Sequence, residues 1–255
     1  MNTISAHNGI FSLGNREGAI ETSLIKKGEF EAKLMAKFFA ALQRFAHIPD
    51  NPTIVDAGAH IGTTSISLMH NGYISKSIAL EPNETSFELL QENIKLNGFE
   101  DDIYPLRTAI SNHNNVAELE LNPKNSGDSR IRVKERCEGW ETETVPCNTL
   151  DAIIKEVPDK FSSIDLLWID IQGHEWHAFE GAKDLLDTGI PVASEVWPHA
   201  MERAGISIDK FLEKATSLWN SYYILHEGQL FHKHIADISW IYETFYGHAN
   251  VVFLK

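Results

Sequence analysis

The chain has 255 residues, a formal net charge of −14 at pH 7 and 43% hydrophobic residues. This length fits one large domain or one domain with an extension, and the composition is ordinary for a folded globular protein. So acidic a chain is a poor general binder of nucleic acid, because contacts to phosphates need lysine and arginine. No apolar run is long enough for a membrane span. We therefore expect neither a nucleic-acid partner nor a membrane partner.

The chain has two cysteines, Cys137 and Cys147. They could pair, but two reduced thiols in a cytosolic protein are the simpler interpretation, so we expect a cytoplasmic protein. Their spacing matches no metal-binding pattern.

Residues 1–28 are polar and rich in glycine and asparagine, which predicts an irregular N-terminal arm ahead of a domain spanning 29–255. From Gly28 to Phe45 apolar residues recur every three or four positions, which predicts a helix that packs on a sheet. Pro49 and Pro52 follow and end that helix.

Short apolar runs then alternate with helical patterns, which is typical of a mostly parallel α/β sheet. Pro105 in the third run predicts an edge strand, because proline cannot donate to a second neighbour. The alternation is interrupted by an antiparallel insertion at about 112–147. The predicted sheet strands are Thr53–Asp56, Ile78–Glu81, Ile103–Leu106, Ile164–Asp170, Pro191–Glu195, Tyr222–Leu225 and Asn250–Leu254.

Four acidic residues stand where predicted strands end: Asp56, Glu81, Asp170 and Glu195. Ligands of open α/β sheets bind beyond the carboxyl ends of the strands, so these carboxylates should converge on one crevice. An acidic crevice favours a cationic cofactor and repels one that carries phosphates.

A glycine turn, Asp56-Ala57-Gly58-Ala59-His60-Ile61-Gly62, follows the first of these strands and precedes a helix. Glu81 lies about twenty residues further on, where a carboxylate can accept both hydroxyls of a ribose. Enzymes that use NAD and enzymes that use S-adenosylmethionine (SAM) share this arrangement, and a glycine turn without any ligand is a third interpretation.

Two features favour SAM over NAD. The spacing Gly-x-x-x-Gly departs from the dinucleotide fingerprint Gly-x-Gly-x-x-Gly, and Asp56 at the mouth of the turn would oppose a pyrophosphate. SAM has a sulfonium and an amino group instead. The residues expected to line its pocket are Asp56, Gly58, Ala59, His60, Gly62, Glu81 and Asp170.

The chain resembles the FkbM-type family of SAM-dependent methyltransferases from about Gly28 to Glu195 and again in the last strand. The order and spacing of several short pieces carry the resemblance. They are Gly28-Glu29-Phe30-Glu31, the glycine turn, Glu81-Pro82, Asn93–Asn97, Thr149-Leu150-Asp151, Ile169–Glu175, Glu180-Gly181-Ala182 and Glu195. Gln172 is a departure, because the family commonly has glutamate there.

The resemblance implies a class I, Rossmann-like methyltransferase fold with a seven-stranded sheet whose last strand is antiparallel. It also implies O-methylation of a hydroxyl on a small-molecule, sugar or natural-product acceptor, which would often be glycosylated. Two alternatives remain: an N-methyltransferase acting on an amide or peptide side chain, and a non-catalytic protein with this fold. An NAD-linked reductase is a more distant third.

The stretch after the fourth strand carries the candidates for catalysis. His174 is the candidate base, because an ordinary histidine titrates near working pH, although a surface histidine is the simpler interpretation. Glu175 would orient the acceptor or cap the next helix, and Asp170 would hold the methionine portion of SAM or polarise the acceptor. Glu195 completes the candidate set. Asn125-Ser126-Gly127, at the tip of the insertion, is a candidate lid over the cofactor.

Asp170 and Glu195, with His174 or His199, offer ligands to Mg²⁺ or Ca²⁺. Carboxylates that only shape a pocket by hydrogen bonding are the favoured interpretation, so we expect no metal. His226, His232 and His234 are expected in a loop near the acceptor.

Overall fold

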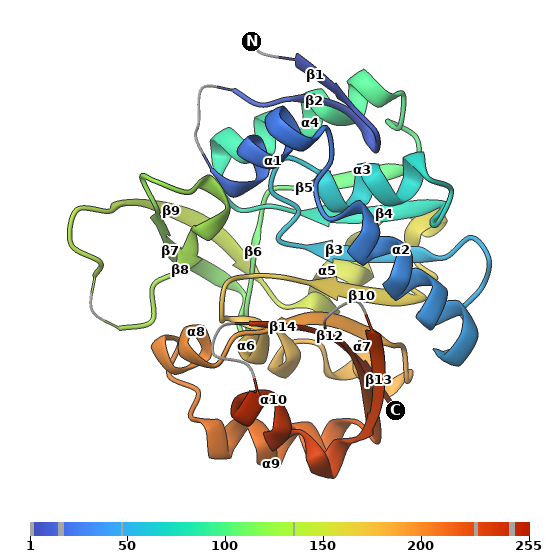
Figure 1. Cartoon of the computed structure of the whole chain (residues 1–255). Helices are drawn as coiled ribbons and strands as arrows, with labels where there is room; N and C mark the ends of the chain where they lie inside the picture. The colour runs from blue at the N-terminus through green and yellow to red at the C-terminus, as the bar shows by residue number, and fades with distance from the viewer. Residues whose placement is uncertain (1–2, 15–17, 47, 135, 227–228, 245–247) are drawn as a thin grey trace.

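The computed structural model describes residues 3–14, 18–46, 48–134, 136–226, 229–244 and 248–255. A mixed sheet runs through the molecule, with helices on both faces and a smaller sheet beside it (Figure 1). In the described residues no helix has the length and apolar character needed to cross a membrane.

The large sheet has the order β13-β12-β14-β11-β10-β3-β4-β5. Its strands are β3 (Thr53–Ala57), β4 (Lys76–Leu80), β5 (Ile103–Leu106), β10 (Leu166–Ile169), β11 (Val192–Val196), β12 (Ser221–His226), β13 (Gln229–His234) and β14 (Ala249–Leu254). The pairs from β5 to β11 are parallel, and β14 is antiparallel to both its neighbours. The expected class I fold, with an antiparallel last strand and β5 at an edge, is confirmed.

An eighth strand extends the seven that were expected. β13 pairs with β12 as an antiparallel hairpin that places His232 opposite Tyr223. The two rings are stacked with centroids 4.4 Å apart. The expectation of a loop at His226, His232 and His234 is therefore wrong, because cross-strand pairing rather than local pattern decides the conformation here.

Helices cover the sheet in two layers. The apolar side chains of α2 (Ala32–Ala41), α3 (Thr63–His70) and α4 (Glu84–Asn97) pack on the face that Ile54 and Ala79 present. On the opposite face, Val55 and Ile78 contact the layer of α5 (Leu150–Glu156), α6 (Glu175–Glu180), α7 (Lys183–Asp187), α9 (Ile208–Leu218) and α10 (Ser239–Thr244). Alternate strand residues point to opposite faces, so Asp56 shares a face with Ile54.

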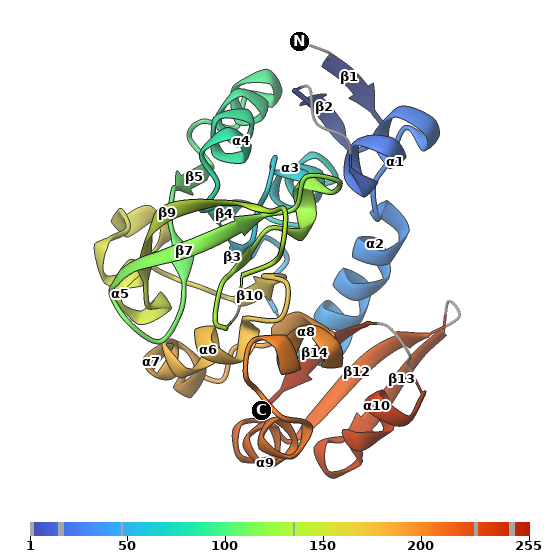
Figure 2. The same cartoon turned by 90° about the vertical axis from the view of Figure 1, so that its left-hand side faces the viewer.

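The insertion forms a four-stranded sheet of order β6-β9-β7-β8. Its elements are β6 (Ala109–Ile110), β7 (Asn115–Leu121), the short turn η2 (Ser126–Asp128), β8 (Arg130–Ile131) and β9 (Glu141–Asn148). β7 pairs antiparallel with β9 and β8, as the alternating pattern predicted. Figure 2 shows this sheet standing in front of the large sheet.

The expectation of an irregular arm at residues 1–28 is wrong. The segment contains a hairpin of β1 (Thr3–Ala6) and β2 (Gly9–Ser12) followed by helix α1 (Ala19–Lys27). The polar residues that suggested a loop find partners on distant helices. The amide oxygen of Asn93 in α4 accepts the backbone N–H of Ser12 at 2.6 Å, and Asn8 donates to Ser67 at 2.7 Å.

The helix expected from Gly28 to Phe45 begins at Ala32 instead, and a separate helix, α1, ends just before Gly28. Gly28 ends α1 with φ 68°, and Glu31 begins α2 with φ 51°. α2 continues into a π-helical turn, Leu42–Ala46. Phe38 and Leu42 are buried as the apolar pattern predicted, whereas Phe45 stacks on Tyr223 near the surface.

Candidate active site

The glycine turn brings the end of β3 into contact with the end of β10. Gly58 has φ +90°, and a Cβ built there would lie 2.0 Å from the backbone oxygen of Asp170. The N–H groups of Gly58 and Ala59 both donate to the backbone oxygen of Leu80, at 3.0 Å. Only glycine fits at residue 58, because this close approach leaves no room for a side chain.

Glu81 follows β4 and binds the turn from the other side. Its Oε2 accepts the backbone N–H of His60 at 2.9 Å, and its Oε1 accepts that of Asn83 at 2.8 Å. The residue is only 6% exposed. An ionised carboxylate only accepts hydrogen bonds, which is the chemistry that ligand hydroxyls require.

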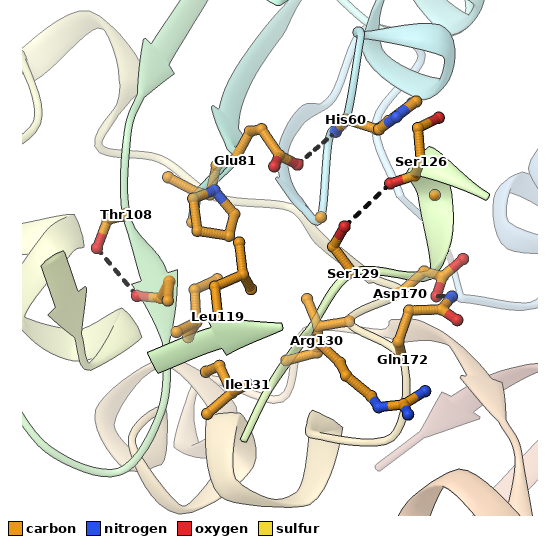
Figure 3. A pocket seen from close by; sticks show the side chains of 17 residues that line it. His60, Glu81, Thr108, Leu119, Ser126, Ser129, Arg130, Ile131, Asp170 and Gln172 are labelled. Carbon is orange, nitrogen blue, oxygen red and sulfur yellow. Dashed lines mark hydrogen bonds between the residues drawn. The ribbon is translucent and has the colours of Figure 1, made fainter. Parts of the chain in front are cut away.

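Glu81 lines a cavity that we call the Glu81 cavity (Figure 3). One wall comes from residues that follow strands of the large sheet, namely Gly58, His60, Thr108 and Asp170. The other wall comes from the insertion. Ser126 and Gly127 of η2 form part of that second wall, where the candidate lid was expected. This segment is held to the N-terminal segment, since Ser126 Oγ donates to Glu21 Oε1 at 2.7 Å.

The second cavity, the Asp56 cavity, shares Gly58, His60 and Asp170 with the first. It lies on the sheet face that α2 covers, and four carboxylic acids line it: Glu31, Asp56, Asp170 and Glu195. Asp56 is anchored there, because its Oδ2 accepts the Ser65 hydroxyl at 2.5 Å and the Ser65 N–H at 3.1 Å.

Burial and mutual repulsion raise the pKa values of these acids. Burial raises the pKa of Asp56 to about 6 despite the hydrogen bonds from Ser65, which oppose the shift. Burial and then the charge of Asp170 raise the pKa of Glu31 to about 7. The same two causes raise the pKa of Glu195, whose Oε1 lies 3.6 Å from His248 Nε2. A cation bound among these groups would relieve the repulsion.

Asp170 and Glu175 organise the loop that follows β10. Gln172, with φ 59°, donates from its side-chain amide to Asp170 Oδ1 at 2.8 Å. Glu175 Oε1 accepts the backbone N–H groups of Ile171 at 2.9 Å and Gly173 at 3.2 Å. Glu175 is buried, and burial followed by the charge of Asp170 raises its pKa to about 7. It lines none of the three cavities, so its position fits loop support rather than contact with an acceptor.

His174 lies on the wall of the third cavity, which we call the Arg203 cavity. His174 is only 5% exposed. Its Nε2 lies 3.0 Å from Ser111 Oγ, and its ring stacks on the ring of His177 with centroids 4.3 Å apart. Burial, and then the charges of His177 and His113, lower the pKa of His174 to about 3. The ring is therefore neutral at physiological pH but is a weak proton acceptor.

The structure brings together Asp56, Gly58, His60, Glu81, Asp170 and Glu195 from the predicted set. Ala59 is instead packed in the core, and Gly62 begins α3 where a Cβ would meet Leu90 at 2.8 Å. Within the described ranges no three histidine, cysteine or acidic side chains converge as a metal site would require. His199 is exposed and lies 3.8 Å from Glu202.

Sequence reasoning missed Glu31 as a site residue, although it lies in one of the pieces that carry the family resemblance. It also missed Thr108, which follows the edge strand β5, and Arg130, which follows η2. No local pattern distinguishes these residues, because each reaches the site only when its element docks.

A profile of the methyltransferase FkbM domain matches residues 56–216, more than half of the chain. The chain belongs to this family. Its cofactor is therefore S-adenosylmethionine, and the chain contains an FkbM-type SAM-dependent methyltransferase domain.

Methyltransferase sdnD of Sordaria araneosa is 27% identical over 164 residues, covering 54% of this chain and 63% of that protein. The chain thus matches less than two thirds of that relative's length. The crystal structure of a methyltransferase FkbM from Methylobacillus flagellatus aligns at a TM-score of 0.48 and 14% identity, over 80% of this chain and 44% of the other. The structure of M. capricolum TrmK in complex with S-adenosylhomocysteine aligns at a TM-score of 0.47 and 13% identity. The alignment covers 89% of this chain and 68% of the other.

The donor set of this FkbM-type domain fits the cofactor. A nearly buried carboxylate, Glu81, suits the two ribose hydroxyls. The acids around the Asp56 cavity suit the ammonium and sulfonium charges. Gly58 lines both cavities, and its lack of a side chain leaves backbone exposed to each of them.

Proposed function

We propose that this protein transfers the methyl group of SAM to a hydroxyl of a small-molecule, sugar or natural-product acceptor. The observation that carries the proposal is that the Glu81 and Asp56 cavities adjoin at Gly58, His60 and Asp170. One cavity holds a carboxylate suited to a ribose, and the other holds carboxylates suited to cations. This pair of sites fits a nucleoside that carries a positively charged amino-acid chain.

The cofactor supplies an electrophilic methyl carbon whose bond to sulfur breaks as the bond to the acceptor oxygen forms. The chain's own residues must then place the acceptor in line and remove its proton, and placement is the larger contribution. Asp170 is a better proton acceptor than His174, because burial raises the pKa of Asp170 and lowers that of His174. We assign His174 a positioning role on the acceptor side, with Gln172 orienting Asp170 through its amide.

The test is a reaction of the purified protein with SAM and matched pairs of acceptors that differ only in a hydroxyl or an amine. Mass spectrometry should detect S-adenosylhomocysteine together with a methylated hydroxyl product. We expect Asp170→Asn to lower kcat by about 10²- to 10⁴-fold, while His174→Gln has a smaller effect. Product from the amine alone would instead establish an N-methyltransferase. A protein that binds no SAM would support the non-catalytic alternative.

We also propose a cytoplasmic location and a catalytic domain spanning 29–255. Both thiols are free in the structure, and burial raises the pKa of Cys147 to about 11, which supports a reduced chain. The N-terminal segment contributes Ile20 to the wall of the Asp56 cavity, so residues 1–28 would assist the domain rather than stand apart from it.

A further inference from the structure

The Arg203 cavity lies next to the cofactor cavities and has the opposite charge. It is an open cavity of about 610 Å³ between the insertion, the loop after β10 and helix α8 (Pro198–Arg203). Four of its lining residues are cationic, Arg130, Arg132, Lys134 and Arg203, and one is acidic, Glu120. This local charge is unexpected on a chain of net charge −14.

Two of the cations already have carboxylate partners. Arg130 lies 3.9 Å from Glu120 and 3.5 Å from Asp128, and its guanidinium stacks over Trp140 at 4.3 Å. Arg132 lies 3.8 Å from Glu118.

The other two cations, Arg203 and Lys134, form no ion pair with any described residue. Arg203 is exposed to solvent, and its guanidinium lies over the ring of Trp197 at 4.9 Å. Partial burial, and then the charge of Arg130, lower the pKa of Arg203. The guanidinium is thus held by an aromatic ring and repelled by a second arginine. An anion placed between the two would remove that repulsion.

The cavity adjoins the Glu81 cavity through shared lining residues. Arg130, Ile131 and Gln172 line both the Arg203 cavity and the Glu81 cavity. In Figure 3 the guanidinium of Arg130 points away from Glu81 and His60, past Gln172. A molecule anchored on the cations would therefore have its other end near Gln172 and Asp170, where the methyl group would be delivered.

We propose that the Arg203 cavity binds the acceptor through an anionic group, a carboxylate or a phosphate, held by Arg203 with Lys134 and Arg130. This inference rests on the proposed function and names the chemical class of its substrate. A volume of about 610 Å³ suits a small molecule. The strongly acidic remainder of the chain disfavours an extended polyanion such as RNA. Arginine is suited to either group, because its planar fork binds carboxylates and phosphates in a bidentate manner.

The first test measures the binding of malonate, inorganic phosphate and the neutral isostere malonamide to the full chain saturated with S-adenosylhomocysteine. We expect malonate or phosphate to bind, malonamide not to bind, and Arg203→Gln to weaken anion binding about 5- to 10-fold. The matched control is Arg44→Gln, because Arg44 also stacks on an aromatic ring, Phe45 at 4.9 Å, but lies outside the cavity. The stronger of the two anions identifies the group.

Three results would overturn the inference: unchanged anion binding in Arg203→Gln, an equal loss in Arg44→Gln, or malonamide binding as well as malonate. A second test compares turnover of hydroxylated acceptors that carry a carboxylate or the corresponding carboxamide. Arg203→Gln should raise KM for the carboxylate only and leave kcat unchanged. Failure of the protein to bind S-adenosylhomocysteine would refute the proposed function instead, and anion binding measured without it would still decide whether the Arg203 cavity is an anion site.

Discussion

At the scale of single residues, Glu81 holds the glycine turn and is the residue that we propose to bind the ribose of the cofactor. Its two backbone hydrogen bonds, from His60 and Asn83, hold the carboxylate in place before any ligand arrives. A rigid acceptor gains more from each hydrogen bond, since less freedom is lost on binding.

We expect Glu81→Gln to weaken SAM binding about 10- to 100-fold, because hydrogen bonds to a charged group contribute about 1.5–3 kcal/mol. Glutamine keeps one acceptor for the backbone but places a donor where the second acceptor was. Calorimetry with SAM measures the effect, and Glu88→Gln, an exposed acid on α4, serves as the control. Equal affinities in the two variants, with the fold intact, would remove Glu81 from the cofactor site.

Glu175 is predicted to make the stability of the cofactor-free protein depend on pH. Its pKa rises from an ordinary 4.5 to about 7 on folding, so between these values the folded state binds more protons than the unfolded state. The contribution of Glu175 to the free energy of unfolding is therefore fully present at low pH. It is lost as the pH rises toward 7, by up to about 1.4 kcal/mol per pH unit.

Glu175→Gln keeps an oxygen for the N–H groups of Ile171 and Gly173 but has no charge to bury. Urea unfolding between about pH 5 and pH 8 should show a shallower decline in stability for the variant than for the wild type. Parallel curves would mean that Glu175 titrates normally in the folded protein.

At the scale of elements, the junction between β3 and β10 positions the site. Side chains at the carboxyl ends of these adjacent parallel strands meet because the chain leaves β3 toward β4 and later returns to β10 on the other side. Such a reversal of strand order creates a crevice, and Gly58 lets the two strand ends approach within it.

Gly58→Ala should disrupt this junction. Alanine at φ +90° would cost about 1–3 kcal/mol in the backbone, and its Cβ would also overlap the backbone oxygen of Asp170. Gly72→Ala is the matched control, because Gly72 also has positive φ, +71°, but nothing lies within 4 Å of the added carbon. The free energy of unfolding, measured with denaturant, and the affinity for S-adenosylhomocysteine should both fall much more in Gly58→Ala than in Gly72→Ala. Similar losses in the two variants would show that the contact with β10 is unimportant.

At the scale of the whole molecule, folding gathers acids that the sequence holds far apart. Glu31 comes from the start of α2, Asp56 from β3, Asp170 from the end of β10 and Glu195 from β11. Their mutual repulsion is a cost of the unliganded fold that a cation offsets. The Arg203 cavity gathers charge of the opposite sign on the far side of Gln172, where we propose that the acceptor binds.

Binding of SAM near pH 7 is therefore predicted to release protons. A cation in the Asp56 cavity lowers the pKa of nearby acids, and Glu31, with a pKa of about 7, is half ionised before binding. Calorimetry in two buffers with different ionisation enthalpies should show a release of up to about one proton. S-adenosylhomocysteine lacks the sulfonium charge and should release fewer. Equal heats in the two buffers would contradict the prediction.

Much of the fold follows from local patterns. The period of apolar residues distinguishes β3, β4, β10 and β11 from the helices between them, and Pro105 correctly places β5 at the edge. The docking of the N-terminal hairpin does not follow from them, because the partners of Ser12 and Ile10 lie on α4, more than eighty residues away. The addition of β13 rests on its hairpin pairing with the preceding strand β12, which the apolar pattern of residues 229–234 does not indicate.

The candidate site likewise depends partly on local sequence and partly on tertiary structure. The amino-acid sequence by itself determined the glycine turn and the acids at strand ends, because turn chemistry and strand termini are encoded within a few neighbouring residues. Only the tertiary structure decided that Glu31 joins those acids, that His174 is buried with a low pKa, and that four cations gather around the Arg203 cavity. Burial and electrostatic interaction depend on what packs against a residue, and those neighbours come from distant parts of the chain.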